Sequence, residues 1–355
     1  MKIKKKLFKL KMFFVKVFFG PYYLFRYKGR LYRRVFFSGD YFFFRKFLEQ
    51  RVYPFVKIIK KPKDIDLLIY EPHRHEGYGR VEELKKYHVG ALQVRDYYAK
   101  LAAKAKFFWN GENTALDMHY LYDDYFLTDF DYAVGFKRDS DKTLYFPIWL
   151  MFLFNGTESR KQIYDKVREI NTKQYKKTKF CALVANHDHV FDYGDKKWGK
   201  QHVPNVRTKL FDMVSKIEHV NAPSKLFHND DNLKGKYKDN KKAYLREFKF
   251  TICPENTKGE GYITEKLFEA FEAGCIPIYW GVVPEEIQEF VNPDSYLYYN
   301  GKNEKEIVAE IKKLNEDEDY YSEFMSREKL KPEIVDFIDS RFKTLEKEFR
   351  CLLEL

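Results

Sequence analysis

Strand-like and helix-like patterns of hydrophobic positions alternate through the first half of the chain. IDLLIY (65–70), KFFWN (106–110) and DYAVGF (131–136) are apolar runs of strand length, and the segment 89–105 has the pattern of a helix. Strands that are separated by helices pair in parallel through crossover connections, so this half is expected to form parallel βαβ units. The apolar segment 144–154 closes it.

The same alternation begins again in the second half. Here we expect strands over 180–186, 248–253 and 275–281, and helices over 207–217 and 264–273. Two sets of alternating elements predict an α/β fold with two doubly wound domains that face a cleft. Sheets of this kind bind ligands outside the carboxyl ends of their strands, so the loops after these strands are the places to look for chemistry.

The pattern divides the chain into four regions. We expect a basic, aromatic N-terminal arm over 1–60, a first domain over 61–170, a second domain over 171–302 and a helical tail over 303–355. The Lys/Thr-rich segment 171–179 is the best linker between the two domains.

Charge is concentrated at the start of the chain. The 355 residues include 65 Lys and Arg and 53 Asp and Glu, and residues 1–39 hold twelve of the basic residues and no acidic one. The remainder is therefore neutral and has no nucleic-acid-binding motif, so no nucleic-acid partner is expected. Aromatic residues interleave with the basic ones in 1–39, which fits either an arm packed on the body or a contact with an anionic membrane surface.

The cysteines and the apolar segments bear on the location of the protein. Cys181, Cys253, Cys275 and Cys351 lie far apart without a CxxC pair, which indicates neither a disulfide framework nor a zinc site. The start has no signal-peptide pattern, and no run of eighteen apolar residues is present. We expect a cytoplasmic protein, with a peripheral position on the inner membrane as the alternative that the arm raises.

The chemistry is concentrated in the stretch 248–281, where a strand is followed by a ten-residue loop, a helix and a second strand. Thr264 is a plausible N-cap of that helix, since its hydroxyl can accept a hydrogen bond from a first-turn amide. Lys266 lies at the positive end of the helix dipole, which is unfavourable unless an anion binds there. Free amides, the dipole and an ammonium together suit a diphosphate. The alternative is a solvated lysine on an ordinary loop, and no GxGxxG or GxxxxGK[ST] motif is present.

The same residues resemble a known family. The run PENTKGEGYITEK (254–266), followed by IPIYWG, resembles the donor-binding signature of the GDP-fucose α-1,3/1,4-fucosyltransferases, glycosyltransferase family 10. FFWNGENT (107–114), followed by DYAVGF, is similar to the pattern of that family's N-terminal domain. The two matches extend the resemblance over roughly residues 65 to 285. Pro254 departs from it, because the family usually has Phe at this position.

The resemblance implies a fold and a reaction. It implies a GT-B architecture of two Rossmann-like domains, with GDP-β-L-fucose in the second domain and the acceptor sugar in the first. Transfer would invert the anomeric centre without an obligatory metal or cofactor, although a divalent cation could assist the departure of the diphosphate. The implied acceptor is GlcNAc or Glc of a bacterial surface oligosaccharide, of N-acetyllactosamine or lipopolysaccharide type, in α-1,3 linkage.

The resemblance also implies residue roles. Glu112 matches the general base that takes the proton of the acceptor hydroxyl; the alternative is a solvated turn residue beside Gly111. The donor-binding positions that match are Arg207, Asn256, Tyr262, Glu265 and Lys266. Of these, Arg207 would contact phosphate unless it is a surface arginine at a helix start. Asn256 would line the nucleotide pocket unless it satisfies the loop backbone.

Two histidine pairs and three rival functions stay open. EPHRHE (71–76) and NHDHV (186–190) each follow a predicted strand, so a place near the donor or acceptor cleft is a better interpretation than a metal site. The rivals are a same-fold transferase with another GDP-sugar, a non-catalytic glycan-binding protein and a basic nucleic-acid binder. Glu112 together with Lys266 argues against the second rival, and the neutral body argues against the third.

Overall fold

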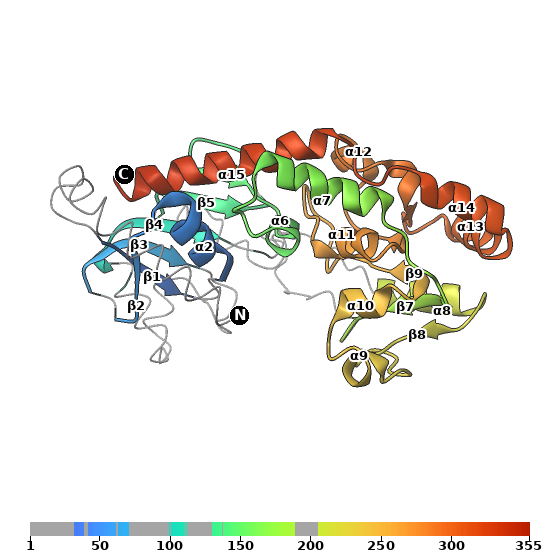
Figure 1. Cartoon of the computed structure of the whole chain (residues 1–355). Coiled ribbons are helices and arrows are strands. Elements are labelled where there is room, and N and C mark those ends of the chain that lie inside the picture. The colour runs from blue at the N-terminus through green and yellow to red at the C-terminus, as the bar shows by residue number, and fades with distance from the viewer. Residues whose placement is uncertain are drawn as a thin grey trace.

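The structure is a computed structural model, and two parallel sheets organise it. The residues that it describes are 32–38, 42–61, 63–70, 99, 101–109, 111, 130–136, 138–188 and 205–355. Each sheet lies at the centre of one lobe, and a long C-terminal helix runs along one side of the molecule over the first lobe (Figure 1). The predicted α/β fold of two parallel-sheet domains is confirmed.

The first sheet has six parallel strands in the order β2-β1-β3-β4-β5-β6. The strands are β1 (Arg33–Ser38), β2 (Val56–Ile59), β3 (Ile65–Tyr70), β4 (Ala103–Trp109), β5 (Tyr132–Gly135) and β6 (Thr143–Tyr145). The strands predicted within 65–70, 106–110 and 131–136 are confirmed. Most of the helix predicted over 89–105 lies outside the described residues, and β4 begins at Ala103 inside that range.

The second sheet has five parallel strands in the order β11-β10-β9-β7-β8. The strands are β7 (Lys179–Leu183), β8 (Val220–Asn221), β9 (Phe248–Ile252), β10 (Ile276–Tyr279) and β11 (Leu297–Tyr298). The helices predicted over 207–217 and 264–273 are α8 (Val206–Ser215) and α11 (Glu265–Glu272). Short elements complete this lobe: α9 (Asn232–Gly235), α10 (Lys241–Leu245), α12 (Pro284–Ile287) and the 3-10 helix η3 (Pro293–Ser295).

The second half of the arm predicted over residues 1–60 belongs to the first lobe. Residues 33–59 are part of the first lobe, because β1 pairs with both β2 and β3, and α2 (Phe42–Phe47) and the π-helix η1 (Leu48–Val52) lie between β1 and β2. Two basic residues of this segment are structural: buried Arg33 donates from Nε to the carbonyl of Leu353 at 2.8 Å, and Arg34 pairs with Asp64. Residues 1–31 lie outside the described residues, so membrane contact through them stays a prediction.

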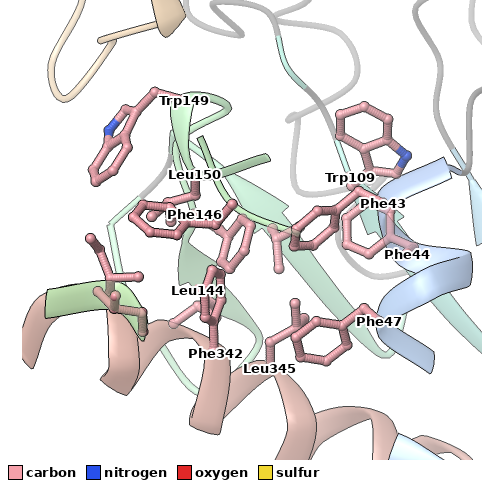
Figure 2. Packing of buried hydrophobic residues seen from close by; sticks show 14 of the residues in the cluster. Phe43, Phe44, Phe47, Trp109, Leu144, Phe146, Trp149, Leu150, Phe342 and Leu345 are labelled. Atoms are coloured by element: carbon pink, nitrogen blue, oxygen red, sulfur yellow. The ribbon is translucent and has the colours of Figure 1, made fainter. Parts of the chain in front are cut away.

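The C-terminal region packs into both lobes and is not a separate tail. It consists of α13 (Glu304–Glu316), α14 (Glu318–Ser326) and α15 (Glu333–Leu352). Ile311 and Phe324, from α13 and α14, belong to the core of the second lobe. Phe342 of α15 is fully buried against the Phe43, Phe47 and Phe146 rings of the first lobe (Figure 2). The apolar stripe of α15 therefore fills the space beside α2.

Two helices between the sheets join the lobes. They are α6 (Trp149–Leu153) and α7 (Arg160–Thr172), and the latter begins with a capping box formed by Ser159 and Gln162. Trp149 of α6 stacks on Phe268 of α11 with ring centroids 4.1 Å apart. Among the described residues, no helix has the length and hydrophobicity of a membrane-spanning segment.

Candidate active site

A pocket of about 300 Å³ lies at the carboxyl ends of β7 and β9. Its walls come from the segment after β7, the first turn of α8, Ser224, α10, the loop 253–264 that follows β9 and the first turn of α11. Adjacent parallel strands end at the same edge of the sheet, which is why these loops converge. The charged or amide side chains in this lining are Asn186, His187, Arg207, Lys241, Asn256, Glu265 and Lys266.

Lys266 is held at the start of α11 by two carboxylates. Its Nζ lies 3.2 Å from Glu255 Oε2 and 3.7 Å from Glu265 Oε1, and it donates to Thr264 Oγ1 at 2.9 Å. Burial disfavours the ammonium form, but Glu255 and Glu265 outweigh burial and raise the pKa of Lys266. The side chain thus stays positive at neutral pH although it sits at the positive end of the helix dipole.

Glu255 is a site residue that the sequence prediction missed. Its side chain is fully buried and accepts hydrogen bonds from the Thr264 backbone amide at 2.8 Å, the Thr264 hydroxyl at 2.5 Å and the Tyr279 hydroxyl at 3.3 Å. The predicted cap is therefore wrong in its detail, because the Thr264 hydroxyl makes no hydrogen bond to a first-turn amide and serves Glu255 and Lys266 instead. An acidic residue shortly after a buried strand was the available signal.

Gly281 leaves room for this carboxylate, which gives a first prediction. A Cβ at Gly281 would lie 2.6 Å from Glu255 Cγ and would also meet the Tyr279 hydroxyl. Gly281→Ala must displace both buried groups, so we expect it to lower the free energy of unfolding by about 1–3 kcal/mol. Chemical denaturation measures this change.

The control for that prediction is Gly235→Ala. A Cβ at Gly235 of α9 would meet nothing within 4 Å, so this substitution adds the same methyl group without a clash. Equal stability of Gly281→Ala and the wild type would contradict the close packing around Glu255.

Arg207 reaches the pocket from the first turn of α8. Its Nη2 donates to Asn256 Oδ1 at 2.8 Å and its Nη1 donates to the carbonyl of His187 at 2.5 Å. Asp188 fixes the helix start, because it accepts from the backbone amides of Arg207 and Thr208 at 3.0 and 2.9 Å. Burial lowers the pKa of the Arg207 guanidinium while the Asp188 carboxylate opposes that change.

The structure brings four of the predicted donor-binding residues together. Arg207, Asn256, Glu265 and Lys266 all line the pocket. Tyr262 is placed differently: it is buried, its ring packs on Phe136 of the first lobe with centroids 4.7 Å apart, and it is not among the described residues that line the pocket.

The loop 253–264 is anchored to the first lobe. The Tyr145 hydroxyl donates to the carbonyl of Gly261 at 2.9 Å, beside the Phe136 and Tyr262 rings. The loop thus links the pocket to the first lobe.

Several predicted residues lie outside the described part of the chain. Glu112, the histidines of 71–76 and His189 are in this group. Within the described residues, no group of three or more His, Cys, Asp or Glu side chains could hold a metal ion.

The pocket has the chemistry of a site for a phosphorylated ligand with hydroxyl groups. Lys266 and Arg207 are two cations in one small, partly buried cavity, which suits the charge of a diphosphate. Burial disfavours the ionised form of Glu265, but Lys266 and Lys241 outweigh it and lower the pKa of this carboxyl. The Glu265 carboxylate is therefore an acceptor for hydroxyl donors such as those of a ribose.

Comparisons with known proteins find similarity to fucosyltransferases. The family model described as "Glycosyltransferase family 10 (fucosyltransferase) C-term" matches residues 196–351. The chain is 28% identical over 234 residues to Alpha-(1,3)-fucosyltransferase FucT of Helicobacter pylori, a match that covers 61% of this chain and 46% of that protein. It is 24% identical over 150 residues to 4-galactosyl-N-acetylglucosaminide 3-alpha-L-fucosyltransferase 9 of Bos taurus, covering 41% of this chain and 39% of that protein. The chain thus spans less than half the length of these relatives.

A solved structure has the same fold. The crystal structure of an alpha1,3-fucosyltransferase with GDP superposes with a TM-score of 0.58, covers 91% of each chain and is 21% identical. The two-lobed arrangement described above is therefore the GT-B type of α/β fold.

Proposed function

We propose that the protein transfers L-fucose from GDP-β-L-fucose to a hydroxyl of an acceptor glycan, because residues 196–351 match the family model of glycosyltransferase family 10, the fucosyltransferases. The observation that carries this proposal is the pocket that Arg207, Glu265 and Lys266 line at the carboxyl edge of the second sheet. Two cations and one carboxylate are what a nucleoside diphosphate needs for its phosphates and its ribose.

In the proposed reaction, the pocket holds the donor and the first lobe holds the acceptor. The acceptor hydroxyl loses its proton to Glu112 as its oxygen attacks the anomeric carbon of fucose. The bond between that carbon and the diphosphate oxygen breaks, and the electron pair leaves with GDP. Lys266 and Arg207 stabilise the negative charge that develops on the leaving diphosphate. Attack opposite the leaving group inverts the configuration.

The two cations bear on the role of a metal. Since Lys266 and Arg207 already face the diphosphate, we propose that no metal is obligatory and that a divalent cation only stimulates transfer. Removal of divalent cations with a chelator should then reduce the rate without abolishing it, and complete loss of transfer would contradict this part of the proposal.

For the acceptor, we propose a GlcNAc or Glc residue of an N-acetyllactosamine-type or lipopolysaccharide glycan in α-1,3 linkage. The names of the two relatives, an α-(1,3)-fucosyltransferase and a 4-galactosyl-N-acetylglucosaminide fucosyltransferase, support this choice.

A panel of nucleotide sugars tests the proposed function. The full chain is incubated with N-acetyllactosamine and, in turn, GDP-fucose, GDP-mannose, UDP-galactose or UDP-GlcNAc, and the products are identified by mass spectrometry. We expect a fucosylated product with GDP-fucose and none with the UDP-sugars. Transfer from GDP-mannose alone would indicate another GDP-sugar as the donor, and recovery of every nucleotide sugar unchanged, without a glycosylated product, would contradict the transferase assignment.

A further inference from the structure

Two adjacent residues of the loop after β9 each contact one of the two pocket cations. Glu255 accepts from Lys266 Nζ at 3.2 Å, and Asn256 Oδ1 accepts from Arg207 Nη2 at 2.8 Å. The cations come from different helices, α11 and α8, so this short segment joins both sides of the pocket.

The arrangement keeps like charges close together. Arg207 is near enough to Lys266 to oppose its protonation, and both side chains line one pocket of about 300 Å³. Two cations repel each other in such a space unless other groups hold them. The fully buried carboxylate of Glu255 supplies a balancing charge, and the amide of Asn256 supplies an acceptor without adding a charge.

The segment that carries both residues is itself well fixed. The Glu255 backbone amide donates to the carbonyl of Trp280 at 2.7 Å, and its side chain is held by Thr264 and Tyr279. A guanidinium has five N–H donors, so the contacts of Arg207 with His187 and Asn256 leave donors for a ligand.

We propose that Glu255 and Asn256 are positioning residues that hold Lys266 and Arg207 in place for the donor diphosphate before it binds. The inference rests on the proposed function, because the diphosphate is that of a GDP-sugar. Groups that are placed before binding need no ordering when the ligand arrives, and this lowers the cost of binding.

A double-mutant cycle tests the role of Asn256. The wild type, Asn256→Ala, Arg207→Met and the double variant are titrated with GDP and, in parallel, with inorganic pyrophosphate. We expect Asn256→Ala to weaken binding of both probes by about tenfold, or 1.4 kcal/mol. The double variant should bind no more weakly than Arg207→Met, because Asn256 acts through the arginine. If the losses of affinity in Asn256→Ala and Arg207→Met multiply in the double variant, the two residues act independently and the positioning role of Asn256 is overturned.

Asn303→Ala is the matched control for this cycle. The Asn303 side chain also makes hydrogen bonds, since its Oδ1 accepts from the Asn300 amide and its Nδ2 donates to the Tyr298 carbonyl, but it lies just before α13 and is not among the pocket residues. We expect it to leave the affinity for both probes unchanged. An equal loss with Asn303→Ala would show that the effect of Asn256→Ala is one of general stability, and would overturn the inference.

The role of Glu255 is tested by the titration of Lys266 without any ligand. The rate at which acetic anhydride labels Lys266, followed by peptide mass spectrometry over a range of pH, gives the pKa of this amine. The charged or titratable groups that face it are Glu255, Glu265, Arg207 and the Cys253 thiol. Glu255→Gln should lower the pKa of Lys266, because a neutral amide no longer offsets the cost of burying the ammonium.

Tyr279→Phe is the control for Glu255→Gln, since it removes a different hydrogen bond of the same carboxylate. Tyr279→Phe should leave the pKa of Lys266 at its wild-type value. If Glu255→Gln does not fold, Glu255→Asp shortens the tether and should give a smaller shift in the same direction. An unchanged titration in the folded Gln or Asp variant would overturn the inference.

The two probes separate failure of the inference from failure of the proposed function. Wild-type protein that binds pyrophosphate but not GDP would contradict the donor assignment, while the cycle with pyrophosphate still decides the role of Asn256. Binding of neither probe would overturn both the proposed function and the inference.

Discussion

Lys266→Met is expected to reduce fucosyl transfer by on the order of a hundredfold to a thousandfold at saturating donor. The ammonium is preorganised at the start of α11 by Glu255, Glu265 and Thr264, and it lines the pocket proposed for the diphosphate. A fixed positive charge interacts most strongly with the negative charge that develops on the leaving group in the transition state. Loss of this charge should therefore lower kcat more than it raises KM. Initial rates over a range of GDP-fucose concentrations separate the two parameters.

The same substitution should also lower stability. Glu255 keeps its contacts with Thr264 and Tyr279 but loses its cation, so we expect the free energy of unfolding to fall by about 1–3 kcal/mol. Rates must therefore be measured well below the unfolding temperature.

Lys161→Met is the matched control for Lys266→Met. Lys161 lies in the first turn of α7 and pairs with Asp165, but it is exposed and lies outside the pocket. We expect the control to leave transfer unchanged. Near-normal turnover of Lys266→Met would show that the lysine does not stabilise the leaving group.

Glu112→Gln is expected to lower transfer by roughly a hundredfold to ten-thousandfold while the affinity for GDP stays within about twofold. Glutamine keeps the size and hydrogen-bonding capacity of the side chain but cannot take the proton of the acceptor hydroxyl. Glu112 follows β4, whose last residue Trp109 is buried, and Gly111 lies against the Ile148 side chain. Trp109 and Gly111 thus belong to the first lobe, whereas the residues of the proposed donor pocket are on the second. Transfer rates and GDP titrations on one preparation measure both quantities.

The control and the thermal melting curve decide between a catalytic and a structural glutamate. Glu289→Gln makes the same chemical change at an exposed position and should affect neither transfer nor binding. Loss of stability together with transfer in Glu112→Gln would indicate that the residue shapes its domain. An unaffected transfer rate would remove it as the base.

The buried parallel strands were predictable because both faces of such a sheet are covered. β3 and β10 consist almost entirely of buried residues, so they read as short apolar runs between turn or helix signals. β1 was assigned to the arm because Arg33 and Arg34 precede its apolar residues. The partner of Arg33 is the carbonyl of Leu353, 320 residues away, and no local pattern reveals such a contact.

The role of a site residue could be predicted where it depends only on the neighbouring sequence. Lys266 at a helix start indicates an anion site through the helix dipole alone. The group that holds Lys266 depends on the three-dimensional path of the loop 253–264, which the sequence does not show, so Glu255 was missed. Thr264 was assigned a capping role, but its hydroxyl donates to the Glu255 carboxylate instead. In the same way, the ring of Tyr262 packs on Phe136 of the other lobe, and this contact cannot be predicted from the sequence of the loop.

The most direct test of the proposed function is a calorimetric titration of the full chain with GDP and with UDP. We expect GDP to bind at least about tenfold more tightly than UDP, a difference of 1.4 kcal/mol, and Lys266→Met to weaken the binding of GDP. Equal affinity for GDP and UDP, or unchanged GDP affinity in Lys266→Met, would contradict the assignment of this pocket to the diphosphate of a GDP-sugar.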